Sequence, residues 1–232
     1  MYLRILSLGL VTSCAVAAAL VYGDAISIPA QWNPWAPLSI ADQPNVLTRY
    51  KLSRLSSDAA GCRAVLSHAQ MRYTPLPDRR TGDGCGFDNA VRIEATTTGV
   101  GEPFSLSCRS AVALALWERH VMQPAAHRYF AASVARLEHF GSYSCRNVYG
   151  REDDRRSQHA TADALDVAGF VLSDGRRIRV LNGWRGDARD AAFLRDVHAG
   201  ACRVFDAVLG PDYNAAHHDH FHLDRGSFKA CR

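Results

Sequence analysis

The sequence has no cysteine pair at C-x-x-C spacing, no internal repeat and no low-complexity tract. The first absence excludes zinc ribbons and dithiol redox motifs, because both need two thiols three positions apart. The other two exclude solenoids and extended low-complexity chains. Of the 232 residues, 47% are apolar and 22% are charged. This composition predicts an ordinary globular protein with one core, or one core and a small appendage.

The sequence also lacks a strongly basic region. The formal net charge is +4, and the densest basic runs, 151–156 and 176–179, are interrupted by Asp153, Asp154 and Ile178. Neither stacking aromatics nor a nucleic-acid-binding motif accompanies these runs, which are typical of solvated faces. We therefore expect no nucleic-acid partner.

Charge is absent from residues 5–22, ILSLGLVTSCAVAAALVY, which lie between Arg4 and Asp24. A run of this length is about the minimum for a membrane-spanning helix and is long for the core of a signal peptide. No A-x-A cleavage site follows it, and the flanking charges favour export of everything after the run. We expect residues 1–24 to form a transmembrane helix that anchors the protein, in preference to a cleaved signal segment.

Six cysteines follow this run. An even number in an exported domain predicts disulfides formed in an oxidising compartment, although the sequence alone does not choose the pairing. Pairs of neighbours would each close a local loop. On that basis the expected disulfides are Cys62–Cys85, Cys108–Cys145 and Cys202–Cys231.

Residues 25–45 form a segment rich in proline and tryptophan, with four prolines and two tryptophans between Ile28 and Asn45. The composition predicts an extended linker close to the membrane surface. Trp32 and Trp35 either lie at the lipid interface or pack on the domain. Residues 46–232 then form a single domain.

Periodicity within this domain predicts an α+β fold, in which a small antiparallel sheet carries the functional site and helices flank it. The predicted helices cover 57–71, a segment from Ser105 or Ser107 to Pro124, 124–140 and 193–208. The predicted strands are 90–95, 142–146, a hairpin of 164–172 with 177–181, and 220–223.

The segment NAAHHDHFHLDRG concentrates four histidines near the C-terminus. A strand over 218–223 would place His218, His220 and His222 on one face and leave His217 off it. A catalytic zinc ion needs three protein ligands and one open position, so further ligands must come from elsewhere. They occur about sixty residues upstream, in SQHATADALD, as an imidazole and a carboxylate. With one histidine of the terminal strand, these two would complete an open His–Asp–His zinc site.

The combined pattern S-x-H-x6-D, from Ser157 to Asp166, followed by H-x-H at 220–222, resembles the signature of zinc peptidases related to D-Ala-D-Ala carboxypeptidases and murein endopeptidases. Within these, the closest resemblance is to the bacterial extensin-like C-terminal domain family. It extends over roughly Leu52–Arg232 and includes SYSCRNVYGR and LGPDYNAAHHDHFHLD.

The resemblance implies a role for each matching residue. Zinc would be held by His159, Asp166 and His222, with His220 beside it as a catalytic residue. His217 matches a further histidine that some murein endopeptidases carry three positions earlier. Arg146 corresponds loosely to an arginine that holds the substrate carboxylate, and with Ser157 it is assigned to substrate binding; a salt bridge to Glu152 or Asp153 is the alternative for Arg146.

Two departures from the peptidase motif bear on catalysis. Ala162 replaces the usual glycine, and no glutamate is an obvious general base, because the nearest, Glu152, lies in a charged loop. Asp163 either faces the site or is a solvated loop carboxylate. Asp219 and Asp224 either orient the ligand imidazoles or stabilise turns.

The resemblance implies a zinc-dependent hydrolase of cell-wall peptides, acting on a peptidoglycan stem peptide or a D-amino-acid crosslink. It would be a single-pass protein of the bacterial inner membrane, with the domain in the periplasm or at the cell surface. The alternative is a catalytically inactive zinc-containing module that binds peptidoglycan or a partner protein. The sequence leaves the oligomeric state open.

Overall fold

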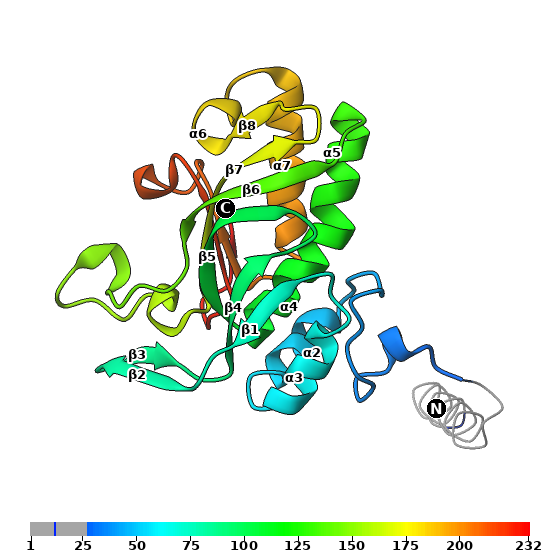
Figure 1. Ribbon diagram of the computed structural model, residues 1–232, viewed down its shortest axis with the longest axis vertical. Helices are drawn as coiled ribbons and strands as arrows, with labels where there is room; N and C mark the ends of the chain where they lie inside the picture. Colours follow the sequence, from blue (N-terminus) through cyan, green and yellow to red (C-terminus); the bar gives the residue numbers. More distant parts are fainter. Residues whose placement is uncertain (1–11, 13–26) are drawn as a thin grey trace, which may run out of the picture.

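The computed structural model describes residue 12 and residues 27–232, and Figure 1 shows its architecture. The apolar run at 5–22, predicted to be a transmembrane anchor, lies outside the described residues except for Thr12. Within the described part, no helix combines the length and apolarity needed to cross a membrane.

The fold is α+β, with one mixed sheet of nine strands and a separate two-stranded ribbon. The large sheet has the order β1-β4-β5-β6-β7-β10-β9-β11, with β8 paired to β7. Its strands are β1 (Arg72–Pro75), β4 (Ala90–Ala95), β5 (Gly99–Ser107), β6 (Val134–Gly141), β7 (Ala164–Leu172), β8 (Arg177–Arg179), β9 (Ala207–Leu209), β10 (Phe221–Asp224) and β11 (Ala230–Cys231). The ribbon consists of β2 (Arg79–Gly82) and β3 (Cys85–Phe87). The sheet is larger than the sequence predicted, and β5–β6 and β9–β11 pair in parallel.

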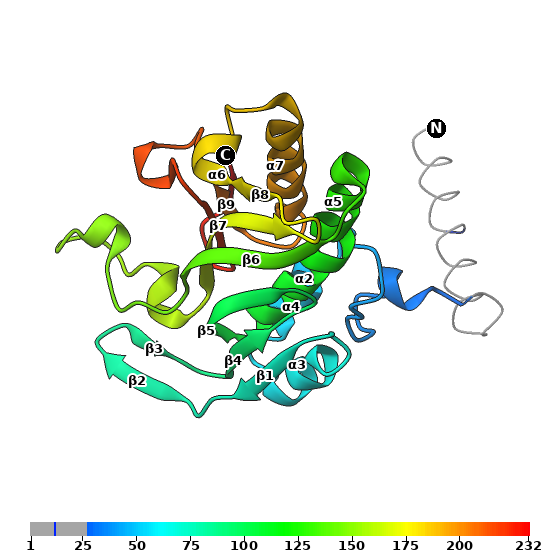
Figure 2. The same ribbon diagram turned by 45° about the horizontal axis from the view of Figure 1, so that its top comes forward.

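Helices cover one side of the large sheet, as Figures 1 and 2 show. They are α2 (Thr48–Arg54), α3 (Ala59–Leu66), α4 (Cys108–Trp117), α5 (Gln123–Phe130) and α7 (Ala188–Ala201), while the short α6 (Val180–Gly183) lies beside β8. Phe170 of β7 lies between the two layers, with its ring 5.2 Å from Phe193 of α7 and 6.2 Å from Trp117 of α4. This buried aromatic contact packs β7 against α4 and α7, and β7 carries part of the site described below.

The strand predictions that matter for the site are confirmed. The structure has strands at 90–95 and 164–172, as predicted, and β8 completes the predicted hairpin. The last predicted strand begins one residue later, at Phe221. Because β10 runs antiparallel to β7, His222 is directly opposite Asp166.

Three other element predictions are wrong. The helix predicted for 124–140 ends at Phe130, because Ala131 turns the chain with φ of 53° and β6 then enters the sheet. No strand forms at 142–146, which is a loop. The helix predicted for 193–208 ends at Ala201, and β9 follows at 207–209. For the two helices, the sheet takes residues whose apolar spacing also suits a helix.

Two of the three expected disulfides are wrong. The structure contains Cys202–Cys231, as predicted, but pairs Cys62 with Cys108 and Cys85 with Cys145. α3 packs on α4 and brings Cys62 next to Cys108, the first residue of α4. Tertiary packing, which nearest-neighbour pairing ignores, therefore decides these two bonds.

A buried carboxyl group makes the stability of this core depend on pH. Glu118 is 1% exposed at the start of the π-helical segment Glu118–Met122, and it accepts hydrogen bonds from the hydroxyls of Thr96 and Thr97. Burial raises the pKa of Glu118 from 4.5 to about 7, although both hydroxyls act to lower it. The folded protein therefore holds this proton more tightly than the unfolded chain does.

Glu118→Gln is expected to remove this pH dependence. In the wild type, the contribution of Glu118 is fully present below pH 4.5 and is lost as the pH rises through about 7. The loss is on the order of 3 kcal/mol. Denaturant unfolding at pH values on both sides of this window should show the variant more stable than the wild type at the higher pH. An equal pH slope in both proteins would contradict the assignment.

Candidate metal centre

Three side chains from separate parts of the chain converge at one end of the β7–β10 pair. His159 lies in the 3₁₀ turn Gln158–Thr161, whose preceding residue Ser157 accepts a hydrogen bond from the His159 amide. Asp166 belongs to β7 and His222 to β10, where the strand register makes them neighbours. Antiparallel pairing places opposite side chains on the same face of a sheet. The turn then folds His159 over both.

The facing atoms of these residues are about equally spaced. The Nε2 atom of His159 is 3.1 Å from Oδ2 of Asp166 and 3.1 Å from Nδ1 of His222, which is 3.0 Å from Oδ1 of Asp166. Three ligands bound about 2.1 Å from a tetrahedral ion lie about 3.4 Å apart. The side chains are at most 12% exposed. The geometry therefore fits a group of metal ligands.

Hydrogen bonds on the far side of each ring determine where the imidazole protons lie. Nδ1 of His159 donates to the Ser142 carbonyl at 2.5 Å, and Nε2 of His222 donates to Asp224 at 2.9 Å. A carbonyl and a carboxylate can only accept, so the lone pairs are on the nitrogens that face each other. Two lone pairs and the Asp166 carboxylate thus meet at one point, and such an arrangement needs a cation or a proton to be stable.

The pKa shifts agree with this excess of acceptors. Burial alone would lower the pKa of His222, but Asp166 and Asp224 raise it to about 9. Burial alone would raise the pKa of Asp166, yet His159 and His222 hold it well below its usual range. A proton can occupy the centre in place of a metal ion, and metal binding would release it.

His220 lies next to this cluster and has its own carboxylate partner. Its Nδ1 donates to Asp219 at 2.8 Å, and its Nε2 is 3.6 Å from Oδ1 of Asp166. Asp219 ends a turn and His220 follows it directly before β10, so the strand alternation does not separate their side chains. Of the two roles that the sequence left open for Asp219, the structure shows orientation of an imidazole, that of His220.

His217, which strand periodicity placed off the site, approaches it. It is 7% exposed, and its ring is 5.3 Å from that of His220 and 5.8 Å from that of His222. Nδ1 of His217 donates to Asn214 at 2.7 Å, which leaves Nε2 as an acceptor. Burial, with the neighbouring His222 and His220, lowers the pKa of His217 to about 4, so the ring is neutral at pH 7.

His218 is not part of the cluster. Its side chain is 62% exposed, and its Nδ1 donates to the Ala215 carbonyl. The prediction that His218 shares a strand face with His220 and His222 is wrong, because β10 begins only at Phe221. Asp224 takes one of its two expected roles, since it orients the ring of His222.

A cavity of about 510 Å³ opens onto the cluster. Arg146 and Ser157, the two residues assigned to substrate binding, both line it. The Arg146 guanidinium is 44% exposed and is 4.0 Å from Asp166, so its ion pair is with the cluster and not with Glu152 or Asp153. Arg155 and Arg156 also line the cavity. The cavity therefore combines cations with the acceptors of the cluster.

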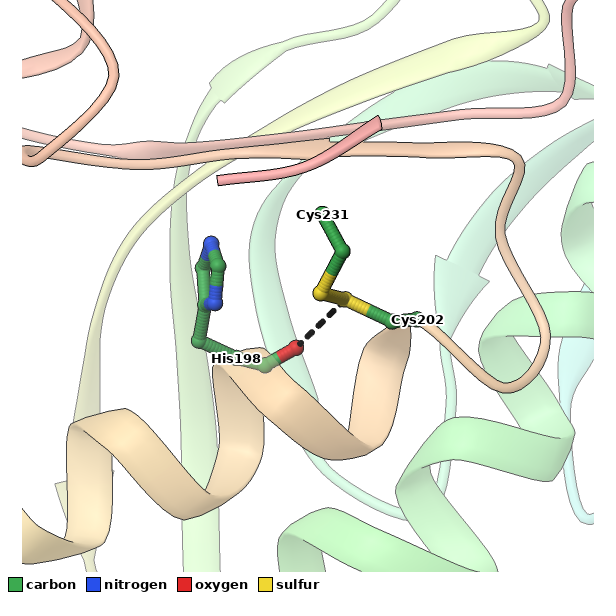
Figure 3. Close-up of side chains that lie close together, drawn as sticks. All are labelled: His198, Cys202 and Cys231. Atoms are coloured by element: carbon green, nitrogen blue, oxygen red, sulfur yellow. Dashed lines mark hydrogen bonds between the residues drawn. A yellow bond between two sulfur atoms is a disulfide. The ribbon is translucent and has the colours of Figure 1, made fainter. Parts of the chain in front are cut away.

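A second group with metal-ligand spacing comprises His198, Cys202 and Cys231. Figure 3 shows that its two sulfur atoms form a disulfide, while the His198 backbone carbonyl faces the sulfur of Cys202. The His198 imidazole hydrogen-bonds the Arg232 carbonyl and packs against Trp184. In the oxidised protein this group is structural. Trp184, which is 6% exposed, fills the core there.

Asp163 fits neither alternative that the sequence left open. Its carboxylate is buried, receives two hydrogen bonds of 2.9 Å from Arg109, and accepts another from Ser107. These bonds fix the turn between His159 and Asp166 to the N-terminus of α4. The preceding residue, Ala162, has φ of 56°, which explains why glycine is usual there.

Asp163→Ala is expected to destabilise the fold by about 3 kcal/mol, because it leaves the largely buried Arg109 guanidinium unpaired. The exposed ion pair Arg185–Asp212 offers a matched control, and Asp212→Ala should change stability by less than about 1 kcal/mol. Denaturant unfolding at constant pH measures both. Equal effects of the two substitutions would show that Asp163 does not hold the turn.

Comparison with known proteins adds one match. A family model described as extensin-like protein C-terminus matches residues 60–232. That range contains the cluster, the cavity residues and all three disulfides. No curated protein and no solved structure matches the chain.

Proposed function

Because the chain belongs to the extensin-like protein C-terminus family, we propose that it is a zinc-dependent hydrolase of cell-wall peptides. The observation that carries the proposal is the convergence of three acceptors, His159, Asp166 and His222, on one point. The resemblance of S-x-H-x6-D and H-x-H to the zinc carboxypeptidases and murein endopeptidases supports the same reading.

The donor set favours zinc over other common ions. Two imidazoles and one carboxylate suit zinc, whereas magnesium and calcium prefer oxygen ligands alone. Three protein ligands leave a fourth position for water or substrate, as in catalytic zinc sites. Bound zinc would supply Lewis-acid polarisation of a peptide carbonyl and lower the pKa of a coordinated water molecule to about 7.

His220 and Asp219 would perform the proton transfers. The Nδ1–H group of His220 donates a hydrogen bond to Asp219. The lone pair of Nε2 can then take a proton from the attacking water. Asp219 would stabilise the imidazolium ion that results, and His220 would then give the proton to the leaving amine. His217, neutral and accepting at Nε2, would receive a hydrogen bond from a substrate N–H group.

The cavity suggests an anionic peptide as substrate. Arg146, Arg155 and Arg156 line it, together with Asp154 and with Asp166 and Asp224, which already interact with the histidines of the cluster. A planar guanidinium pairs well with a carboxylate, which a peptidoglycan stem peptide supplies. The three disulfides support an oxidising compartment. We therefore place the domain in the periplasm or at the cell surface, held by the apolar run at 5–22.

The full chain, purified oxidised and incubated with isolated peptidoglycan, tests the proposal. We expect new amino termini in the digest, their loss after treatment with a chelator, and their return with added zinc. Binding to peptidoglycan without cleavage would instead identify an inactive module. The sequence left that alternative open because no glutamate was an obvious general base, and the His220–Asp219 pair supports His220 as the base instead.

A further inference from the structure

Exposed apolar side chains concentrate at the N-terminal end of the described chain. Ten large apolar residues are exposed in the described part, and five of them lie between residues 28 and 50. They are Ile28, Trp32, Trp35, Val46 and Tyr50, with exposures of 46%, 51%, 78%, 84% and 48%. We call these five residues the N-terminal apolar surface.

The backbone that carries this surface is fastened to the domain. Lys51 of α2 is 4% exposed and donates to the Ala30 carbonyl at 2.7 Å. The side chain of Asn45 donates to the Gln31 carbonyl at 2.9 Å, and Arg54 donates to the Pro34 carbonyl at 3.2 Å. The segment predicted to be an extended linker is thus hydrogen-bonded to α2, on both sides of Trp32.

This combination of a fixed backbone and exposed tryptophans differs from the rest of the protein. The other two tryptophans, Trp117 and Trp184, are 0% and 6% exposed. Trp32 and Trp35 are 51% and 78% exposed, so neither is buried in the domain as Trp117 and Trp184 are. The surface also lies before residue 60, where the match to the family model begins. It is therefore an addition to the matched domain.

We propose that the N-terminal apolar surface docks on the headgroup region of a phospholipid bilayer. The inference rests on the proposed anchor at 5–22, which ends six residues before Ile28. Six extended residues span about 20 Å, so an inserted anchor keeps this surface close to the lipid. Tryptophan and tyrosine prefer this interface, because one end of each ring system is apolar and the other is wet.

Docking would set the direction in which the catalytic cavity faces. Figures 1 and 2 both show the segment after residue 27, in blue, on the opposite side of the molecule from the yellow-green loop near 150 and the orange-red loop near 215. Those two loops contribute Tyr149, Arg155 and His217 to the cavity wall. With the blue side on the bilayer, the cavity opens away from the lipid.

Tryptophan fluorescence of the full chain in phospholipid vesicles tests the proposal. Bromine atoms on the lipid chains quench tryptophans that lie in the bilayer interface, and bromines near the headgroups should quench more than bromines near the chain ends. We expect strong quenching in the wild type. The double variant Trp32→Phe, Trp35→Phe should lose most of it, because Trp117 and Trp184 are buried in the domain.

A matched control places a tryptophan on the cavity side. Phe140 is 61% exposed, and its ring is 5.7 Å from that of His220. In the double-variant background, Phe140→Trp should be quenched by a water-soluble quencher and not by brominated lipid. Equal lipid quenching of this position would overturn the proposed orientation.

The remaining outcomes separate this proposal from the others. A chain that enters the vesicles with Trp32 and Trp35 unquenched by lipid overturns the docking surface alone. A chain that stays in solution overturns the anchor and the docking surface together. Zinc content and hydrolysis of peptidoglycan are measured independently of both results.

Discussion

Asp166→Ala and His222→Ala are each expected to reduce bound zinc from about one ion per chain to near zero. Each substitution removes one of three ligand side chains whose facing atoms lie 3.0–3.2 Å apart, so only two ligands remain. Removal of a residue that only hydrogen-bonds a ligand typically weakens metal binding about 10–100-fold. Removal of the ligand itself should weaken metal binding by more than this. Elemental analysis of the purified oxidised protein measures the effect.

His218→Ala is the matched control, because it removes a histidine of the same segment that is 62% exposed. It should leave the zinc content unchanged. Asp224→Asn should lie between the two, since it keeps the ligands but replaces the carboxylate that orients His222. If both ligand variants retained zinc, the cluster would not be the metal centre.

His220→Ala is expected to leave zinc in place and to lower kcat/KM for peptidoglycan hydrolysis by about 10²–10⁴-fold. The imidazole is 3.6 Å from Asp166 and outside the tight group of donors, so its loss should affect proton transfer and not metal binding. The rate of appearance of new amino termini, normalised to zinc content, is the measurement. Full activity in a zinc-loaded His220→Ala protein would exclude His220 as the general base.

Asp219→Asn should have a smaller effect through the same imidazole. The amide oxygen can still accept the Nδ1 proton at 2.8 Å, but it cannot neutralise the imidazolium ion. A charged hydrogen bond contributes about 1.5–3 kcal/mol, which corresponds to about 10–100-fold in rate. Asp212→Asn, at an exposed carboxylate seven residues earlier, is the control. If the two substitutions had the same effect, Asp219 would have no role in positioning the base.

The sequence predicted the strands of the site because their signals are local. A continuous apolar run bounded by turn residues gives β7, and the alternation around His222 gives β10. Once the strands are antiparallel, a carboxylate and an imidazole in matching positions face each other, as Asp166 and His222 do. The match to the peptidase pattern then selected His159 from the loop, where periodicity gives no information.

What the sequence could not predict depends on contacts between distant segments. Asp163 pairs with Arg109, 54 residues earlier, and nothing around either residue indicates the other. The same holds for Cys62 and Cys108, which meet only because α3 packs on α4. β6 lies within the helix predicted for 124–140, and its buried residues Val134 and Leu137 are three positions apart, a spacing that suits a helix as well.

The position of β10 has a consequence for how the protein matures. β10 lies near the C-terminal end of the sequence, yet within the sheet it is an interior strand between β7 and β9. A chain that ends at residue 210 contains His159 and Asp166 but lacks His222, the third member of the cluster. Under the proposed function, such a chain would bind zinc poorly and would lack activity. The metal site would form only once the final strands have paired with the sheet.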